Sequence, residues 1–165
     1  MRLIVMSDSH GYSKPIVQIL NNNPTADFFI HLGDGYREFS RVAEDFTEDY
    51  GYDPDKFICV RGNSEFGVQN LPDTLVLPFE GKKVLITHGH KLNVKYGLDT
   101  LKSLAVTEKA DIVLYGHTHR KNEAFENGIY FLNPGSITEP RGSFPPSYGY
   151  VDIVQNGIAT GIVKI

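Results

Sequence analysis

Short runs of apolar, β-branched and aromatic residues recur along the first two thirds of the chain. They cover residues 2–6, 27–32, 57–60, 82–87 and 111–115. Runs this short, with few polar interruptions, are typical of strands that are buried on both faces. We therefore expect five buried strands in a central sheet of an α/β protein.

The intervals between these runs show the spacing of helices. Residues 36–49 carry apolar side chains every three or four positions, so that one face of a helix would be apolar. Residues 13–20 also predict a helix, with Ser13 as the capping residue and Pro15 in the first turn. A third helix is expected from about residue 94 to residue 108.

The carboxyl third of the chain has a different pattern. Asn127–Gly128 and Asn156–Gly157 each separate two strand-like runs, which is a strong signal for a β-hairpin. These hairpins predict a second, mostly antiparallel sheet. Residues 133–147 are rich in proline, glycine and serine and are interpreted as a surface loop. The whole chain, residues 1–165, is expected to form a single domain.

Charge and composition limit the classes of function. The chain has 16 basic and 20 acidic residues and a net charge of -4, without a basic cluster that would indicate binding to a nucleic-acid polymer. No apolar run approaches the roughly 20 residues that cross a bilayer. A single cysteine, Cys59, fits a reducing compartment, and we expect a cytoplasmic protein. The sequence leaves open whether it forms a homo-oligomer.

Each of the five early runs is followed by a cluster of polar residues. Since ligands bind at the carboxyl ends of strands in α/β sheets, these clusters are expected to converge on one edge. Residues two apart in an extended segment project to the same side, which would direct paired donors into one cavity. The candidate metal ligands are Asp8, His10, Asp34, Asn63, His88, His117 and His119.

All seven donors are oxygen or imidazole groups, and none is a thiolate. Such a set suits manganese, iron or zinc and argues against a structural cysteine–zinc site. Seven donors exceed the needs of one tetrahedral ion but serve two ions if Asp34 bridges them. Two divalent ions, two carboxylates and a bridging hydroxide leave a charge of about +1, which attracts an anionic phosphate ester.

Taken alone, most of these motifs are ordinary turn sequences. Five donor clusters, each closing a separate strand in order along the chain, are not expected from independent turns. The ordered set resembles the calcineurin-like metallophosphoesterases, and among them the small bacterial and archaeal YfcE-type phosphodiesterases. The resemblance covers nearly the whole chain and implies an α/β fold: a four-layer α-β-β-α sandwich with two mixed β-sheets.

The resemblance also implies a ligand set for each ion. One ion would be held by Asp8, His10, Asp34 and His119, and the other by Asp34, Asn63, His88 and His117. It further implies phosphodiesterase activity on a small-molecule phosphate ester. Manganese is the expected metal, with iron, zinc and nickel as alternatives.

One departure from larger relatives concerns the leaving group. Those proteins follow Gly-Asn with a histidine that can protonate the departing oxygen, whereas this chain has Ser64. His90 is a candidate for the general acid, and Asn63 a candidate that acts both on the metal and in catalysis. His90 is equally interpreted as a structural residue. Arg61 and Arg120 are expected to be surface residues rather than substrate contacts.

Two alternatives to a phosphodiesterase remain. A phosphomonoesterase would use the same site and differ in its substrate. A non-catalytic scaffold of the same fold is the second alternative, because a eukaryotic vesicle-coat relative shares the fold after its metal site has decayed. All seven donor positions here carry residues that can bind a metal, which favours the enzyme.

Overall fold

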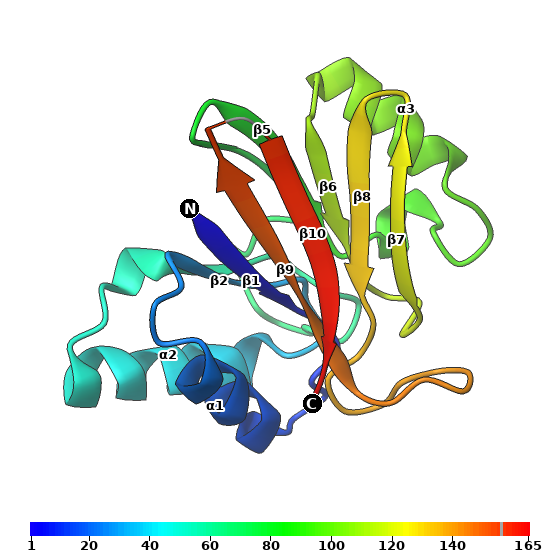
Figure 1. The fold of residues 1–165 in the computed structure, drawn as a ribbon. Helices are drawn as coiled ribbons and strands as arrows, with labels where there is room; N and C mark the ends of the chain where they lie inside the picture. The colour runs from blue at the N-terminus through cyan, green and yellow to red at the C-terminus, as the bar shows by residue number, and fades with distance from the viewer. Residues whose placement is uncertain (156) are drawn as a thin grey trace.

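The computed structural model describes residues 1–155 and 157–165, in which two five-stranded sheets lie between outer helices (Figure 1). The first sheet has the order β10-β9-β1-β2-β3 and the second the order β4-β5-β6-β8-β7. The strands of the first sheet are β1 (Arg2–Met6), β2 (Phe28–His31), β3 (Phe57–Cys59), β9 (Ser147–Val154) and β10 (Gly157–Lys164). Those of the second are β4 (Thr74–Phe79), β5 (Lys82–Thr87), β6 (Ile112–Tyr115), β7 (Lys121–Glu126) and β8 (Ile129–Pro134).

The helices cover the outer faces of the two sheets. Helices α1 (Ser13–Asn22) and α2 (Tyr36–Tyr50) lie against the first sheet, and α3 (Asp99–Glu108) lies against the second (Figure 1). The four layers and the mixed sheets confirm the expected α-β-β-α sandwich.

Alternate residues of β1 enter different parts of the core. Leu3 and Val5 pack between the sheets, whereas Ile4 and Met6 pack beneath α1 and α2. This division follows from the two-residue period of a strand and explains why the run is apolar without alternation. Both faces of β1 are therefore buried.

The five early strands are confirmed, but they do not form one central sheet. β1, β2 and β3 are parallel neighbours in the first sheet, while β5 and β6 are parallel neighbours in the second. The carboxyl ends of both parallel sets lead to the same region of the molecule, where the candidate ligands meet. The expectation of convergence was right, and the expectation of a single sheet was wrong.

The carboxyl-terminal hairpins also differ from the prediction. β7 and β8 form a hairpin at Asn127 and Gly128, which both have positive φ, as the common two-residue turn requires. Asn156 of the second predicted turn lies outside the described residues, but β9 and β10 pair antiparallel. These strands do not build a separate sheet, because β8 pairs with β6 and β9 pairs with β1.

Three local expectations are corrected. α1 begins at Ser13, and the N-cap position is Tyr12, which makes no capping hydrogen bond through its side chain. α3 begins at Asp99 rather than near residue 94, because a short 3₁₀ turn precedes it and Asn93 adopts a positive φ. Strand β4 was not predicted; it lies at a sheet edge, where Pro78 is tolerated.

None of the described helices combines the length and the apolar character that crossing a bilayer requires.

Candidate metal centre

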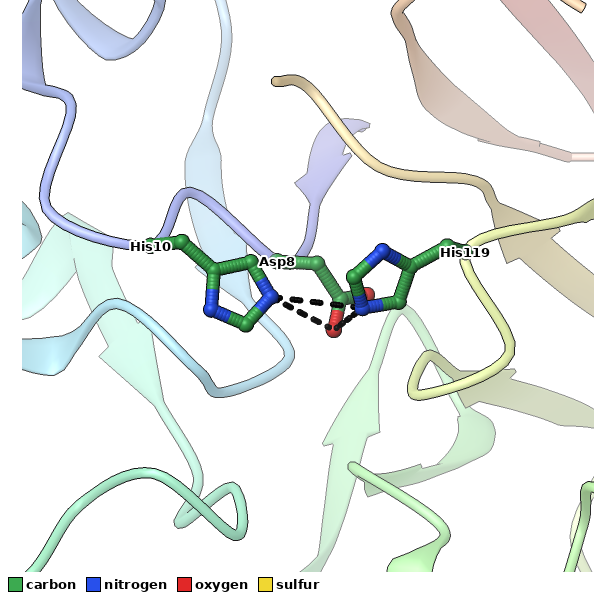
Figure 2. A group of neighbouring side chains, drawn as sticks. All are labelled: Asp8, His10 and His119. Carbon is green, nitrogen blue, oxygen red and sulfur yellow. Dashed lines mark hydrogen bonds and ion pairs between the residues drawn. The ribbon is translucent and has the colours of Figure 1, made fainter. Parts of the chain in front are cut away.

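The first of two donor clusters joins Asp8 and His10, which follow β1, to His119, which follows β6 (Figure 2). The Nε2 atoms of His10 and His119 lie 3.2 Å apart. Asp8 Oδ1 lies 3.2 Å from Nε2 of His119 and 4.0 Å from Nε2 of His10. A point equidistant from the two Nε2 atoms and Asp8 Oδ1 lies about 2 Å from each of them. This distance equals the length of a bond from an imidazole nitrogen or a carboxylate oxygen to zinc.

Hydrogen bonds around this cluster orient its lone pairs inward. Nδ1–H of His119 donates to the carbonyl oxygen of Glu139 at 2.7 Å, so that Nε2 of the neutral ring carries a lone pair. The hydroxyl of Ser7 donates to Asp8 Oδ2 at 2.6 Å. The other oxygen, Oδ1, is buried and has no hydrogen-bond partner among the described residues. Lone pairs that face one another in this way favour a cation between them.

The second cluster joins Asp34, His88 and His117, which follow β2, β5 and β6. Nε2 of His88 lies 3.5 Å from Asp34 Oδ2 and 3.1 Å from Nδ1 of His117. Asn63, after β3, adds an amide oxygen at 3.2 Å from the same Nε2 atom. Nδ1–H of His88 donates to the carbonyl oxygen of Leu32 at 2.7 Å, which again leaves Nε2 free to bind a metal.

All seven ligands predicted from the sequence thus lie in two compact groups. The grouping follows the two sets implied by the family resemblance except at Asp34, which the resemblance assigns to both sets and which lies here with His88 and His117, with Asn63 beside them. Oδ1 of Asp34 accepts a hydrogen bond from Ser64 N–H at 2.7 Å, so Oδ2 is the oxygen directed toward His88. The donor types and their spacing fit two divalent cations.

The backbone brings the side chains together in an unexpected way. Positive φ angles occur at Asp8 (58°), His10 (45°), Asp34 (56°), His117 (66°) and His119 (57°). Left-handed backbone is uncommon for residues other than glycine and costs energy, which the surrounding structure must supply. The prediction that Asp8 and His10 converge because they lie in an extended segment was therefore wrong in its reason, although the side chains do converge.

Glycine allows the strand ends to approach one another. A Cβ atom on Gly62 would lie 2.2 Å from Asp34 Oδ1 and 2.3 Å from the Asp34 backbone nitrogen. The loop after β3 can therefore contact the loop after β2 only if this position has no side chain. That contact places Asn63 next to His88.

The carboxylates of both clusters favour their ionised forms. Burial alone raises the pKa of Asp8, but the neighbouring rings of His119 and His88 and the hydrogen bond from Ser7 more than offset it, so that the pKa is lowered. Burial likewise raises the pKa of Asp34, and interactions with His88 and Ser64 reverse that effect. Both residues therefore remain anionic at neutral pH, as metal binding requires.

The histidines divide into two kinds. Burial lowers the pKa of His88 and of His119, but the nearby carboxylates of Asp34 and Asp8, respectively, outweigh it, so that both values are raised. The pKa of His117 is lowered to about 4 by burial and by the positive charges of His88 and Lys95. Carboxylate neighbours thus distinguish His88 and His119 from His117.

Glu65 is a buried residue that the sequence interpretation missed. Its carboxylate accepts hydrogen bonds from the backbone N–H groups of Gly62 at 2.5 Å, Gly35 at 2.6 Å, Tyr36 at 3.1 Å and Asp34 at 3.2 Å. It thereby satisfies the amino end of α2 and joins the loops that carry Asp34 and Asn63. The acidic residue after Gly-Asn-Ser was the available signal.

His31, the last residue of β2, lies outside the two donor clusters. The ring is fully buried, and its Nδ1 accepts a hydrogen bond from Gly33 N–H at 3.1 Å. Its Nε2 lies 3.0 Å from the hydroxyl of Ser9, which donates to Glu38 at 2.6 Å. Burial lowers the pKa of His31 to about 4, so the ring is neutral at physiological pH.

Residues 133–147 are only in part the surface loop that was expected. Residues 133–137 are buried, and the hydroxyls of Ser136 and Thr138 both donate to the carbonyl oxygen of Asp8, at 2.8 and 2.9 Å. The loop stabilises the strained turn that carries Asp8. Proline, glycine and serine here indicated a tightly packed support rather than exposure.

The remaining candidates have separate environments. His90 lies beside the second cluster, with its ring centroid 5.3 Å from that of His88, and its Nδ1 is buried without a partner among the described residues. Burial and the charge of His88 lower the pKa of His90, so the ring less often carries the proton that a general acid must donate. Arg61 binds the carbonyl oxygen of Leu71 and lies 3.6 Å from Asp73, as expected of a structural residue.

A hollow of about 430 Å³ opens beside the two clusters. His10, Asp34 and Ser64 contribute to its wall, together with Tyr36, Arg37 and Phe66. A larger hollow of about 920 Å³ lies near Met1 and Asp111 and contains none of the candidate ligands. The smaller hollow is therefore the one placed to receive a group bound at the clusters.

Comparison with known proteins gives a consistent family. Residues 1–156 match the model of the calcineurin-like phosphoesterase superfamily domain. The probable metallophosphoesterase YsnB of Bacillus subtilis is 31% identical, over 97% of this chain and 88% of that protein. The phosphodiesterase YfcE of Escherichia coli K12 is also 31% identical, over 92% of this chain and 88% of YfcE.

Solved structures give the same fold. A predicted phosphoesterase from Streptococcus pneumoniae superposes with a TM-score of 0.82 at 32% identity, over 99% of this chain and 88% of that one. Vps29 of Chaetomium thermophilum superposes with a TM-score of 0.74 at 19% identity, over 98% and 96% of the two chains. The second likeness concerns the fold alone.

Proposed function

This chain belongs to the calcineurin-like phosphoesterase superfamily, and from that premise we propose that residues 1–165 form one domain that hydrolyses phosphodiesters with two metal ions. The family is metal-dependent, and its relatives include the phosphodiesterase YfcE. The observation that carries the proposal is the pair of inward-facing donor clusters, in which Asp8 Oδ1 is buried without a hydrogen-bond partner among the described residues.

The proposed ligands are divided between two ions. Asp8, His10 and His119 hold one ion, and Asn63, His88 and His117 hold the other. Asp34 would contribute to both ions, and its Oδ2 is the oxygen directed toward His88, because Oδ1 accepts the hydrogen bond from Ser64 N–H. Manganese is the metal we expect, with iron, zinc and nickel as alternatives that suit the same oxygen and imidazole donors.

When bound, the ions would activate a water molecule as nucleophile and supply positive charge that stabilises the phosphate oxygens. The protein's own part is to orient the donors. Nδ1–H of His88 and of His119 each donate to a backbone carbonyl, which fixes the tautomer that binds metal. Asn63 offers its amide oxygen to the second ion, and its Nδ2–H can contact the substrate phosphate.

Protonation of the leaving group is the step for which the chain is poorly equipped. Ser64 has no acidity comparable to that of an imidazole, and the lowered pKa of His90 favours its neutral form. Substrates whose leaving group departs without a proton should therefore react fastest. A phosphodiester with a nitrophenolate leaving group meets this condition.

Two other functions fit parts of the structure. A phosphomonoesterase would use the same donors and differ only in the group that enters the hollow beside Ser64. A scaffold would retain the fold without the metal, as considered from the sequence. The scaffold explains neither the unpartnered Asp8 oxygen nor the two sets of aligned lone pairs, so we favour an enzyme.

The test compares bis(p-nitrophenyl) phosphate with p-nitrophenyl phosphate, with and without manganese. The proposal predicts faster turnover of the diester, loss of activity on exhaustive chelation, and recovery when manganese is restored. His119→Gln should abolish the activity while the circular dichroism spectrum is retained. Preference for the monoester, or unchanged turnover after chelation, would contradict the phosphodiesterase assignment.

A further inference from the structure

A third hollow, of about 540 Å³, is lined in part by the segment that carries His117 and His119. It lies where the segment before α3, the connection from β6 to β7 and the loop after β8 meet. Four cationic residues line it, and no carboxylate is among its lining residues. The cations are Lys95, Arg120, Lys121 and Arg141; we call this hollow the cationic hollow.

These four charges are not neutralised within the described residues. None of the four takes part in an ion pair there, and Lys121 Nζ lies 4.4 Å from the centroid of the Phe144 ring. The net charge of the chain is -4, so the residues outside this group together carry -8. Positive charge is therefore concentrated at one place on an otherwise acidic protein, which favours a local anionic ligand.

The cationic hollow adjoins the chain segment that carries two candidate ligands of the metal centre. Arg120 follows His119 in the chain, and the backbone N–H of Arg141 donates to the carbonyl oxygen of His119 at 2.9 Å. Thr118, which lines the hollow, lies between the two ligands His117 and His119. The segment from His117 to Arg120 therefore contributes side chains both to the donor clusters and to the hollow, which places the two next to each other.

Neutral donors and apolar side chains complete the wall. Asn122 Nδ2 donates to the hydroxyl oxygen of Tyr115 at 2.8 Å, which leaves the Tyr115 hydrogen free for another acceptor. Val94 and Leu98 provide an apolar side. The volume is within the usual range for a small-molecule site.

We propose that the cationic hollow binds a second phosphate group of the substrate whose phosphodiester is cleaved at the metal centre. This inference rests on the proposed function and narrows its substrate class to diesters that carry an additional phosphate. A nucleic-acid polymer is disfavoured, because the basic group is confined to one hollow and the remaining charge of -8 repels an extended phosphate backbone.

The test uses two substrates with the same leaving group in the metal-loaded protein. They are thymidine 5′-(p-nitrophenyl phosphate) and the same compound with a 3′-phosphate. We expect kcat/KM to be about tenfold higher for the phosphorylated compound, mainly through a lower KM, since each charge-assisted contact adds binding energy. Lys95→Gln/Lys121→Gln should bring the ratio close to one. The matched control Lys14→Gln/Lys164→Gln has the same charge change outside the hollow and should keep the ratio.

A binding measurement separates this inference from the proposed function. Pyrophosphate is titrated calorimetrically into the metal-free full-length protein, and saturable binding that weakens about tenfold in Lys95→Gln/Lys121→Gln but not in the control supports the hollow. Hydrolysis of bis(p-nitrophenyl) phosphate tests the phosphodiesterase independently. If that hydrolysis fails while pyrophosphate binds as expected, the proposed function is wrong and the anion site stands as a binding site alone.

Three results would overturn the inference itself. The first is a kcat/KM ratio of one for the wild-type protein. The second is an equal change of that ratio, or of pyrophosphate affinity, in the hollow variant and the control. The third is a higher affinity for a 20-nucleotide oligothymidylate, measured by fluorescence anisotropy, than for pyrophosphate, if that affinity depends on Lys95 and Lys121.

Discussion

The carboxylate of Glu65 accepts a hydrogen bond from the backbone N–H of Gly35 at 2.6 Å and so joins the loop after β3 to the start of α2. Gly62, Asp34 and Tyr36 donate to the same carboxylate. The two loops that carry Asp34 and Asn63 are therefore held by one buried anion. The geometry of the second donor cluster depends on a residue that need not contact a metal.

Replacing Glu65 tests this dependence. Glu65→Gln keeps the size of the side chain but turns an NH₂ group toward backbone donors, so that at least two hydrogen bonds are lost. We expect a loss of about 2–4 kcal/mol in the free energy of unfolding and a 10–100-fold weaker metal affinity. Urea denaturation and metal titration measure the two effects. Glu48→Gln, at an exposed position on α2, is the control, and equal behaviour of the two variants would contradict the role of Glu65.

His31 predicts a pH dependence of stability in the metal-free protein. The pKa of His31 is about 4 in the folded protein, compared with 6.5 for the unfolded chain. Between pH 4 and pH 6.5 the unfolded chain therefore binds a proton at this ring that the folded protein does not bind. The stability that His31 provides is therefore complete above pH 6.5 and is lost as the pH falls toward 4. The loss is on the order of 3 kcal/mol.

The measurement is urea denaturation between pH 7.5 and pH 4.5, with chelator present throughout. His31→Gln should lower stability at pH 7.5, because the acceptor for Gly33 N–H changes, but it should reduce the decline with falling pH. An identical pH profile for the wild-type protein and the variant would show that His31 is not titrating in this range.

The identity of the residue after Asn63 leads to a kinetic prediction. If no side chain protonates the departing oxygen, negative charge accumulates on it, and the rate must fall steeply as the pKa of the leaving group rises. Ser64 is exposed, so an imidazole has room at this position. Ser64→His should flatten the dependence, with the largest gain for alkyl esters and little change for nitrophenolate.

A series of aryl and alkyl diesters measures this slope in the wild-type protein first and then in the variant. Ser64→Asn serves as a control for size without acidity. A wild-type rate that does not depend on leaving-group pKa would mean that an acid already acts or that another step is limiting. In that case the interpretation of Ser64 is wrong.

Local patterns in the sequence predicted the five early strands and the candidate donors that follow them, whereas the four-layer sandwich was expected from the family resemblance. Asp34 and His88 come directly after buried parallel strands, and the carboxyl ends of such strands meet wherever the strands are placed. The division of these strands between two sheets was not predictable from their apolar character. It depends on which neighbours pair, as when β8 joins β6 rather than forming a new sheet.

Other features depended on contacts between distant parts of the chain. Glu65 follows a turn-like Gly-Asn-Ser segment, and only the approach of the β2 loop shows that its carboxylate is buried. Lys95 and Arg141 are far apart in the sequence, so no local cluster of basic residues marks the cationic hollow. The backbone of Asp8, with its positive φ, accepts a hydrogen bond from the hydroxyl of Ser136, which is 128 residues away in the sequence.

The central claim is that two ions share Asp34, and metal content per folded chain tests it most directly. Purified protein is loaded with manganese, freed of unbound ions and analysed by mass spectrometry of the metal, beside circular dichroism. We predict two ions per chain for the wild type and for the exposed-site control Asp49→Asn. Asp34→Asn should remain folded and lose occupancy at both positions. Two fully retained ions in folded Asp34→Asn, or a single ion in the wild-type protein, would contradict the account.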